Sequence, residues 1–162
     1  MQTKTQKIVL TALLASLTCV ATMIIKIPSP LKGYVNLGDC VVLLSGWLLS
    51  PIYGFLAAGI GSALADVFSG YIIYAPITFV IKGLMALIAY LLSRKSKKLP
   101  FLIISGFTAE AVMVIGYFIF EGFIYGFIPS AANIPFNAVQ GAAGLILGIA
   151  LVRVFKKSDI VK

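Results

Sequence analysis

The 162-residue sequence is 60% hydrophobic and 11% charged, and its mean hydropathy of +1.07 lies far above that of a soluble domain. Its net charge of +8 comes from basic residues at the ends of apolar runs, where they face anionic lipid, so a nucleic-acid partner is not indicated. The absence of histidine and the wide spacing of Cys19 and Cys40 argue against zinc, haem and histidine-based catalysis. We therefore expect an integral membrane protein without a metal site or cofactor.

Six apolar segments, separated by charges, proline and glycine, follow one another along the chain. They are 7–26, 38–50, 52–70, 72–93, 101–122 and 131–154. The second is too short to cross the bilayer unaided, and the chain leaves no room for a separate soluble domain. The sequence predicts an all-α integral membrane protein, a six-transmembrane-helix bundle that forms a single membrane domain over residues 1–162.

Basic residues predict the orientation of this bundle. They cluster at Lys4 and Lys7, at 94–98 ("RKSKK") and at 153–157 ("RVFKK"), which fall on one side of a six-span chain. The positive-inside rule assigns that side, and with it both termini, to the cytoplasm. The exceptions are Lys26 and Lys32, which fall in the first outer loop.

The first segment has two interpretations. Basic residues precede its apolar stretch, and the residues ending at Ala21 would pass as a signal-peptide cleavage site. The apolar run continues to Ile25, however, which favours a retained helix. Small residues on this helix, spaced four apart, permit close approach of another helix. These residues are Thr11, Ala12, Ala15 and Ser16.

Polar residues in three consecutive spans lie at similar depths. From the helical rise of about 1.5 Å per residue, Lys82 lies roughly 15 Å from either surface, and Glu110 in the fifth span lies near the same level. Spacings of four and three put Asn133, Asn137 and Gln140 of the sixth span on one helical face. Together these residues predict a cavity open to the outside.

Purely structural roles remain open for the same residues. Lys82 and Glu110 are compatible with a buried ion pair that joins two helices, and Asn137 and Gln140 with interhelical hydrogen bonds. Asp39 follows "NLG" at a helix start, so N-capping is its default role. Asp66 stands near the outer end of the third span, where it would either cap, hold the following loop or touch a ligand.

The predicted outer loops are rich in aromatic residues. Tyr34 and Asn36 precede the second span, and Tyr71 and Tyr74 precede the fourth. Tyrosines at this depth are commonly interfacial anchors. Aromatic walls with a few convergent polar groups also describe a site for a flat heteroaromatic ligand. The sequence alone leaves both interpretations open.

No enzymatic chemistry is visible in the chain. It has no Walker-type phosphate loop and no nucleophile paired with a base, so we expect that it is not an enzyme. One alternative is a solitary secondary carrier or channel that uses Lys82 and Glu110 as an ion relay. A weaker alternative is a structural subunit that binds no ligand.

The stretch from Gly33 to Leu91 carries a resemblance to a known family. It contains "NLGD", then "GxxxGxGSALAD" as Gly54 to Asp66, then "IKG", and "NIPFNAVQGAAG" follows later in the chain. In this order the motifs resemble those of the substrate-binding membrane subunits (S components) of energy-coupling factor (ECF) vitamin transporters. Each motif is weak alone, and the combination is fairly specific.

The resemblance implies a multi-pass protein of a prokaryotic plasma membrane that binds a vitamin from outside beneath the first outer loop. Its implied partners are a transmembrane coupling protein and two ATPases, which would supply ATP hydrolysis. The family's small-residue motif contacts the coupling protein, and its best matches here are Ala12 and Ser16, with Thr11 and Ala15 adjacent.

The resemblance is nearest to the subgroup linked with pyridoxine or hydroxymethylpyrimidine uptake, which suggests Tyr74, Asn137 and Gln140 as stacking and hydrogen-bonding groups. We expect the site floor to be formed by the polar face of the sixth span with Lys82 and Glu110. The predicted substrate-binding set is Tyr34, Asn36, Tyr74, Lys82, Glu110, Asn133, Asn137 and Gln140.

Overall fold

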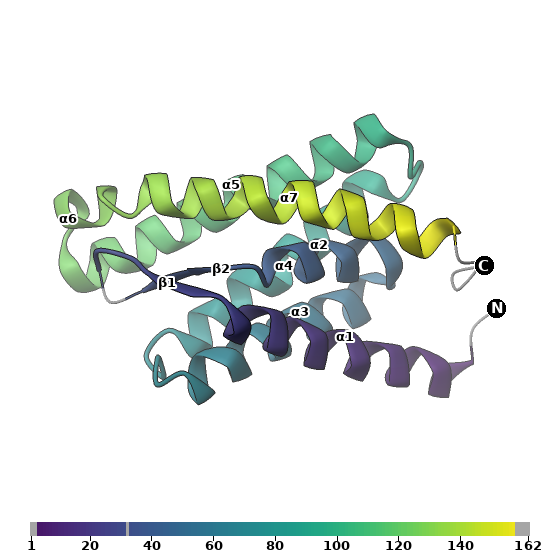
Figure 1. The fold of residues 1–162 in the computed structure, drawn as a ribbon, viewed down its shortest axis with the longest axis horizontal. Helices are drawn as coiled ribbons and strands as arrows, with labels where there is room; N and C mark the ends of the chain where they lie inside the picture. Colours follow the sequence, from purple (N-terminus) through teal and green to yellow (C-terminus); the bar gives the residue numbers. More distant parts are fainter. Residues whose placement is uncertain (1–2, 32, 158–162) are drawn as a thin grey trace.

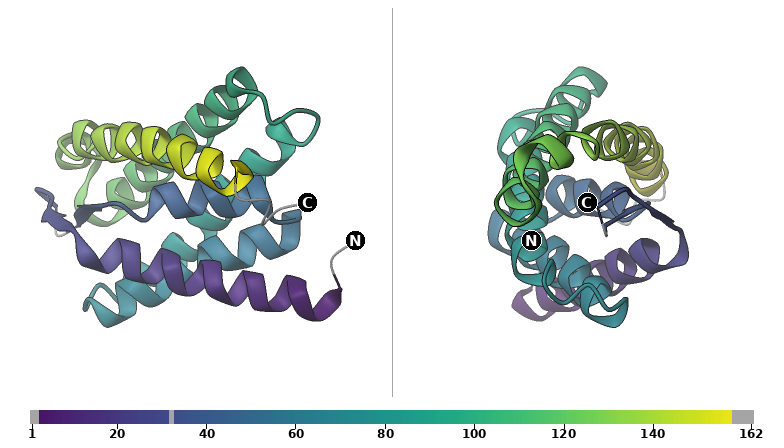
Figure 2. Two further views of the ribbon diagram at one scale, coloured as in Figure 1. Left: turned by 45° about the vertical axis from the view of Figure 1, so that its right-hand side comes forward. Right: turned by 90° about the vertical axis from the view of Figure 1, so that its left-hand side faces the viewer.

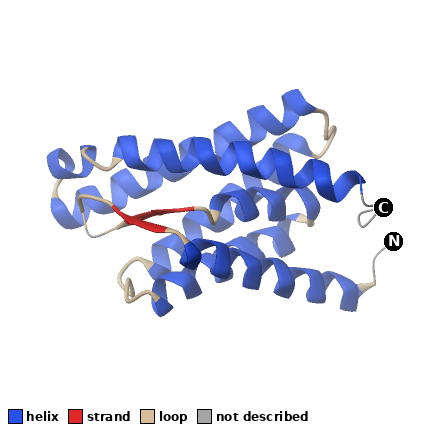
Figure 3. Cartoon of the chain, in the orientation of Figure 1, coloured by secondary structure: helices blue, strands red, loops and turns tan. Residues whose placement is uncertain are grey.

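The computed structural model describes residues 3–31 and 33–157 and is almost entirely helical, so Lys32 lies outside the described residues (Figure 1). The helices are α1 (Lys4–Ile24), α2 (Asp39–Leu48), α3 (Pro51–Phe68), α4 (Ala75–Ser93), α5 (Leu99–Tyr125), α6 (Phe127–Ala131) and α7 (Ile134–Lys157). An antiparallel pair of short strands, β1 (Lys26–Pro28) and β2 (Tyr34–Asn36), joins α1 to α2 and is the only sheet in the described part (Figure 3).

Within the described residues, five stretches are long and apolar enough to cross a membrane. They are α1, α3, α4, α5 and the stretch 127–154 that contains α6 and most of α7. Large apolar side chains on their outward faces are exposed, including Ile52, Phe107 and Ile146, as expected for helices that face lipid. The fold is that of a helical, multi-pass membrane protein.

Helix α2 forms the centre of the bundle. It has ten residues, and all from Asp39 to Trp47 are buried. It packs against α1, α3, α4, α5 and α7, which surround it in the end-on view of Figure 2. A helix that is apolar on every side is stable only when other helices enclose it. The shortness predicted for this segment thus corresponds to an enclosed helix.

Different segments and connections of the chain lie at the two ends of the bundle (Figure 1). The start of α1, the end of α7 and the connection from α4 to α5 lie at one end. The β1–β2 hairpin, the connection from α3 to α4 and the short α6 lie at the other. The basic loop 94–98 is therefore at the end opposite the hairpin.

Small residues let α1 approach α3 closely. A Cβ added at Gly61 of α3 would lie 2.3 Å from the carbonyl oxygen of Ala15, so a larger residue there would meet backbone. Ala15 and Thr11 are half-buried, whereas Ala12 and Ser16 are exposed. The four small residues of α1 thus divide between an inward pair and an outward pair.

Gly61→Leu should therefore destabilise the protein, because the side chain would force α1 away from α3. The cost of such overpacking is about 1–3 kcal/mol or more. Thermal unfolding in detergent would measure it, with Ala12→Leu on α1 as the control because Ala12 is exposed. Equal melting temperatures for the two variants would contradict the packing described here.

Candidate ligand-binding site

A small cavity lies under the hairpin at one end of the bundle, with about 40 Å³ of space for the centres of water-sized molecules. It is lined by strand β2, the preceding turn and the outer parts of α3, α4, α5 and α7. The lining residues are Ser29, Gly33, Tyr34, Asn36, Asp66, Tyr71, Tyr74, Thr78, Tyr117, Glu121, Asn137 and Gln140.

Tyr34 closes one side of the cavity. Its hydroxyl donates a hydrogen bond of 2.7 Å to Oδ1 of Asp66, and its ring lies 4.8 Å from that of Tyr71, centroid to centroid. Burial raises the pKa of Tyr34, and the adjacent Asp66 carboxylate raises it further, so the phenol stays a neutral donor. Strand β2 is thereby tied to the outer end of α3.

Glu121 of α5 lies on the opposite side of the cavity. Its Oε1 accepts a 3.3 Å hydrogen bond from the hydroxyl of Tyr74, and both oxygens are 2.9 Å from Nδ2 of Asn133. The Tyr74 hydroxyl also lies 3.1 Å from the carbonyl oxygen of Leu31 in the hairpin turn. Asn133 therefore orients Glu121 from behind and does not line the cavity.

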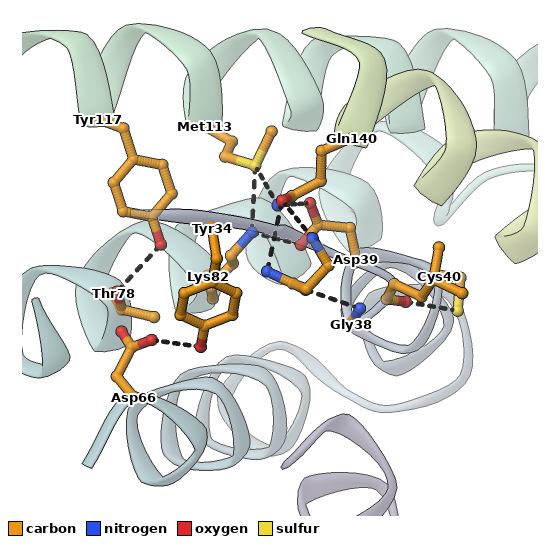
Figure 4. A network of polar contacts seen from close by, with 12 residues as sticks. Tyr34, Gly38, Asp39, Cys40, Asp66, Thr78, Lys82, Met113, Tyr117 and Gln140 are labelled. Carbon is orange, nitrogen blue, oxygen red and sulfur yellow. Dashed lines mark hydrogen bonds and ion pairs between the residues drawn. The ribbon is translucent and has the colours of Figure 1, made fainter. Parts of the chain in front are cut away.

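A buried polar network forms the floor beneath the cavity (Figure 4). Lys82 of α4 forms an ion pair with Asp39 Oδ1, and Gln140 Nε2 donates to Asp39 Oδ2 at 2.7 Å. Gln140 Oε1 in turn accepts the backbone N–H of Asn36 at 2.9 Å. Lys82 Nζ also lies 5.6 Å from the ring centroid of Tyr117, so the network reaches the cavity wall. Strand β2 is thus connected to the centre of the bundle.

This network corrects two expectations from the sequence. Lys82 pairs with Asp39, and not with Glu110. The N-cap of α2 is Gly38, and the Asp39 side chain makes no capping hydrogen bond. The position of Asp39 in its predicted span puts it at the outer end of a helix. Because α2 is short and enclosed, its first residue lies inside the bundle and completely buried, within reach of Lys82.

Glu110 lies away from the outer cavity. Its carboxylate is against Gly141 and Gly144 of α7, and neither oxygen has a hydrogen-bond partner among the described residues. It borders an apolar groove between α5 and α7 whose other lining residues include Phe107 and Leu145. The close approach of glycines to Glu110 explains how this helix pair accommodates the side chain.

The structure thus brings together most of the predicted substrate-binding set. Tyr34, Asn36, Tyr74, Asn137 and Gln140 line the cavity, Lys82 lies below it and Asn133 behind Glu121. The predicted set left out the other seven lining residues, which are Ser29, Gly33, Asp66, Tyr71, Thr78, Tyr117 and Glu121. An acidic residue inside an apolar span is a functional signal in itself, so Glu121 was accessible to sequence reasoning.

The fold and the cavity indicate a class of protein, and comparison with known proteins then identifies the family. A polar cavity under a loop at one end of a multi-pass helical membrane protein is an arrangement that small-molecule transport proteins use. The chain belongs to the family described as "ECF-type riboflavin transporter, S component", whose model matches residues 2–157. The resemblance found in the sequence is therefore confirmed.

Two further similarities agree with this assignment. A solved structure described as "Structure and mechanism of the S component of a bacterial ECF transporter" shares 25% identity and a TM-score of 0.79, covering 96% of this chain and 98% of that one. The chain is also 36% identical to an uncharacterised Pyrococcus woesei protein, over 85% of this chain and 93% of the relative. The family is a transport component and not an enzyme, and it does not favour a solitary carrier.

The Lys82–Asp39 pair generates a stability prediction. Lys82→Met should destabilise the fold by about 3–5 kcal/mol, because it leaves a buried carboxylate without its cation. Lys82→Met combined with Asp39→Asn should recover part of that loss. Unfolding of the four proteins in a double-mutant cycle would measure the coupling between the two residues.

Glu110→Gln serves as the comparison in the same experiment, since Glu110 has no partner among the described residues. It should neither reproduce the loss nor rescue Lys82→Met. Rescue of Lys82→Met by Glu110→Gln, and not by Asp39→Asn, would restore the pairing that the sequence suggested.

Proposed function

We propose that this protein is the S component of an ECF importer that binds a pyridoxine-type or hydroxymethylpyrimidine vitamin precursor from outside the cell. The observation that carries the proposal is the cavity under the β1–β2 hairpin, walled by tyrosines and edged by side-chain amides and carboxylates. Aromatic faces bind a flat ring, and a few polar groups fix its orientation. The family assignment makes a vitamin the natural ligand class.

The proposed topology is a single membrane domain with six spans and both termini in the cytoplasm of a prokaryote. The basic residues Lys4, Lys7 and 94–98 lie at the end of the bundle opposite the hairpin, which supports this orientation. The cavity then faces the outside. Helix α2 would be the sixth segment of this topology, and it is enclosed by the other helices and does not span the bilayer by itself.

Cavity size supports a ligand with one ring. The space is small, with about 40 Å³ for the centres of water-sized molecules, so in this proposal the hairpin moves outward when ligand binds. A single-ring ligand needs a smaller displacement than a three-ring ligand. In this proposal Tyr74 stacks on the ring, Asn137 and Gln140 hydrogen-bond to it, and Tyr34 and Asn36 close over it. Lys82 holds the floor, and Glu110 has no contact with ligand.

Riboflavin is the second candidate ligand, because the family description names it. Four tyrosines, Tyr34, Tyr71, Tyr74 and Tyr117, line the cavity and offer aromatic surface for a larger ring system. Accommodating it would require a larger movement of the hairpin. Binding measurements distinguish the two candidates directly.

The outward face of α1 is the proposed contact surface for the partner subunits. Ala12 and Ser16 are exposed there, next to the half-buried Thr11 and Ala15. Small residues permit close helix contact within a membrane. We propose that Ala12 and Ser16 contact the transmembrane coupling protein, and that two ATPase subunits attached to it drive transport.

Purified protein should bind one vitamin of this class with a Kd below micromolar, measured by titration calorimetry in detergent. The panel contains pyridoxine, pyridoxamine, hydroxymethylpyrimidine, thiamine and riboflavin. Tyr74→Ala should weaken binding, because it removes both a ring face and the hydroxyl that contacts Glu121. Failure of the wild-type protein to bind any water-soluble vitamin would contradict the proposed function.

Ala12→Leu and Ser16→Leu should retain ligand binding but lose most ATP-dependent uptake in cells, because a larger side chain would separate α1 from the coupling protein. Ala138→Leu is a matched control, since Ala138 is exposed on α7. Uptake of labelled vitamin, measured with and without the ATPases, provides the readout. Full uptake by Ala12→Leu and Ser16→Leu would place the coupling surface elsewhere.

A further inference from the structure

We propose that the cavity selects a ligand carrying a protonated nitrogen that faces Asp66, and that it rejects phosphorylated forms of the same vitamin. This inference rests on the proposed function and narrows its ligand class. It concerns the charge of the ligand, which neither the family description nor the shape of the cavity specifies.

The charge of the cavity wall is the first observation. Its lining contains two carboxylates, Asp66 and Glu121, and neither a lysine nor an arginine among the described residues. Both side chains are more than nine-tenths buried, with exposures of 6% and 3%. A small space lined by two buried acidic side chains favours a positive occupant, because water screens the charges of buried groups only weakly.

The second observation is that Asp66 has an unused acceptor. Its Oδ1 accepts the Tyr34 hydroxyl, but its buried Oδ2 has no hydrogen-bond partner among the described residues. A buried carboxylate oxygen without a donor is costly, so a ligand that supplies an N–H gains by satisfying it. The Tyr34 bond leaves Asp66 fixed in place for that contact.

Glu121 differs from Asp66 in this respect. Its oxygens already accept hydrogen bonds from Tyr74 and Asn133, which are uncharged donors. Glu121 therefore adds negative charge to the cavity, while Asp66 provides the open hydrogen-bonding position.

Both nearby lysines make their direct polar contacts with other groups. Lys82 lies beneath the cavity, where its ion pair is with Asp39. Lys26 is exposed on the hairpin, and its Nζ donates to Ser69 at 2.9 Å and lies 5.9 Å from the Tyr34 ring centroid. The ion pair of Lys82 and the hydrogen bond of Lys26 are thus made with groups other than Asp66 and Glu121.

The aromatic wall favours the same ligand charge. The rings of Tyr34, Tyr71, Tyr74 and Tyr117 border the space, and their faces attract cations. A protonated pyridine, an aminopyrimidine or an alkylamine on a ring would combine ring stacking with a charge-assisted hydrogen bond to Asp66. A phosphate ester would bring two negative charges next to two carboxylates, which opposes binding.

Paired ligands that differ by one phosphate test this inference. Wild-type protein in detergent is titrated with pyridoxamine and pyridoxamine 5′-phosphate, and with riboflavin and its 5′-phosphate. The amine should bind at least about tenfold more tightly than its phosphate ester, and more tightly than uncharged riboflavin. Asp66→Asn should weaken amine binding by about tenfold or more, since it removes the charge and keeps the shape.

Glu110→Gln is the matched control, because it neutralises a buried carboxylate that lies outside the cavity. It should leave amine affinity unchanged. Equal affinity for an amine and its phosphate ester would overturn the inference, and so would full amine affinity in Asp66→Asn. The comparison of paired ligands on wild-type protein decides the question even where Asp66→Asn fails to fold.

Different results would contradict the proposed vitamin-binding function and the proposed charge selectivity. Tight binding of riboflavin with no binding of the cationic ligands would overturn the charge selectivity and leave the vitamin-binding function standing. Absence of binding across the whole panel would remove the proposed function and the charge selectivity with it.

Discussion

The buried ion pair between Lys82 and Asp39 is the interaction on which the interior of this protein depends. A lysine ammonium in the middle of a membrane helix is costly, and its own side chain is too short to reach either surface. Asp39 offsets that cost because the chain folds back after the hairpin and begins α2 inside the bundle. Helices α2 and α4 are held together by this contact.

The pair also connects the interior to the hairpin. Gln140 links Asp39 to Asn36 of strand β2, so α7, α2 and the hairpin share one polar network (Figure 4). A buried network of this kind is stable only when its members are all hydrogen-bonded. The Asn36–Gln140 contact is therefore the link between this network and the hairpin.

The outer cavity and the groove beside Glu110 show two uses of buried carboxylates. Asp66 and Glu121 lie among tyrosines and amides that donate hydrogen bonds to them. Glu110 lies among apolar residues and glycines, with no donor in the described part of the chain. Sequence depth alone made Glu110 resemble a site residue, because depth does not report the direction in which a helix presents its side chains.

The sequence by itself determined the membrane class, the family and much of the cavity wall. Hydropathy depends on composition and span length, and the spacing of Asn137 and Gln140 on α7 puts them on one face whatever surrounds them. Only the tertiary structure decided the partner of Lys82, since depth in the sequence pointed to Glu110 and put Asp39 at a helix start. It also decided the separation of Glu110 from the cavity and the inclusion of Thr78, Tyr117 and Glu121, because these depend on the rotation of each helix, which packing against α2 sets.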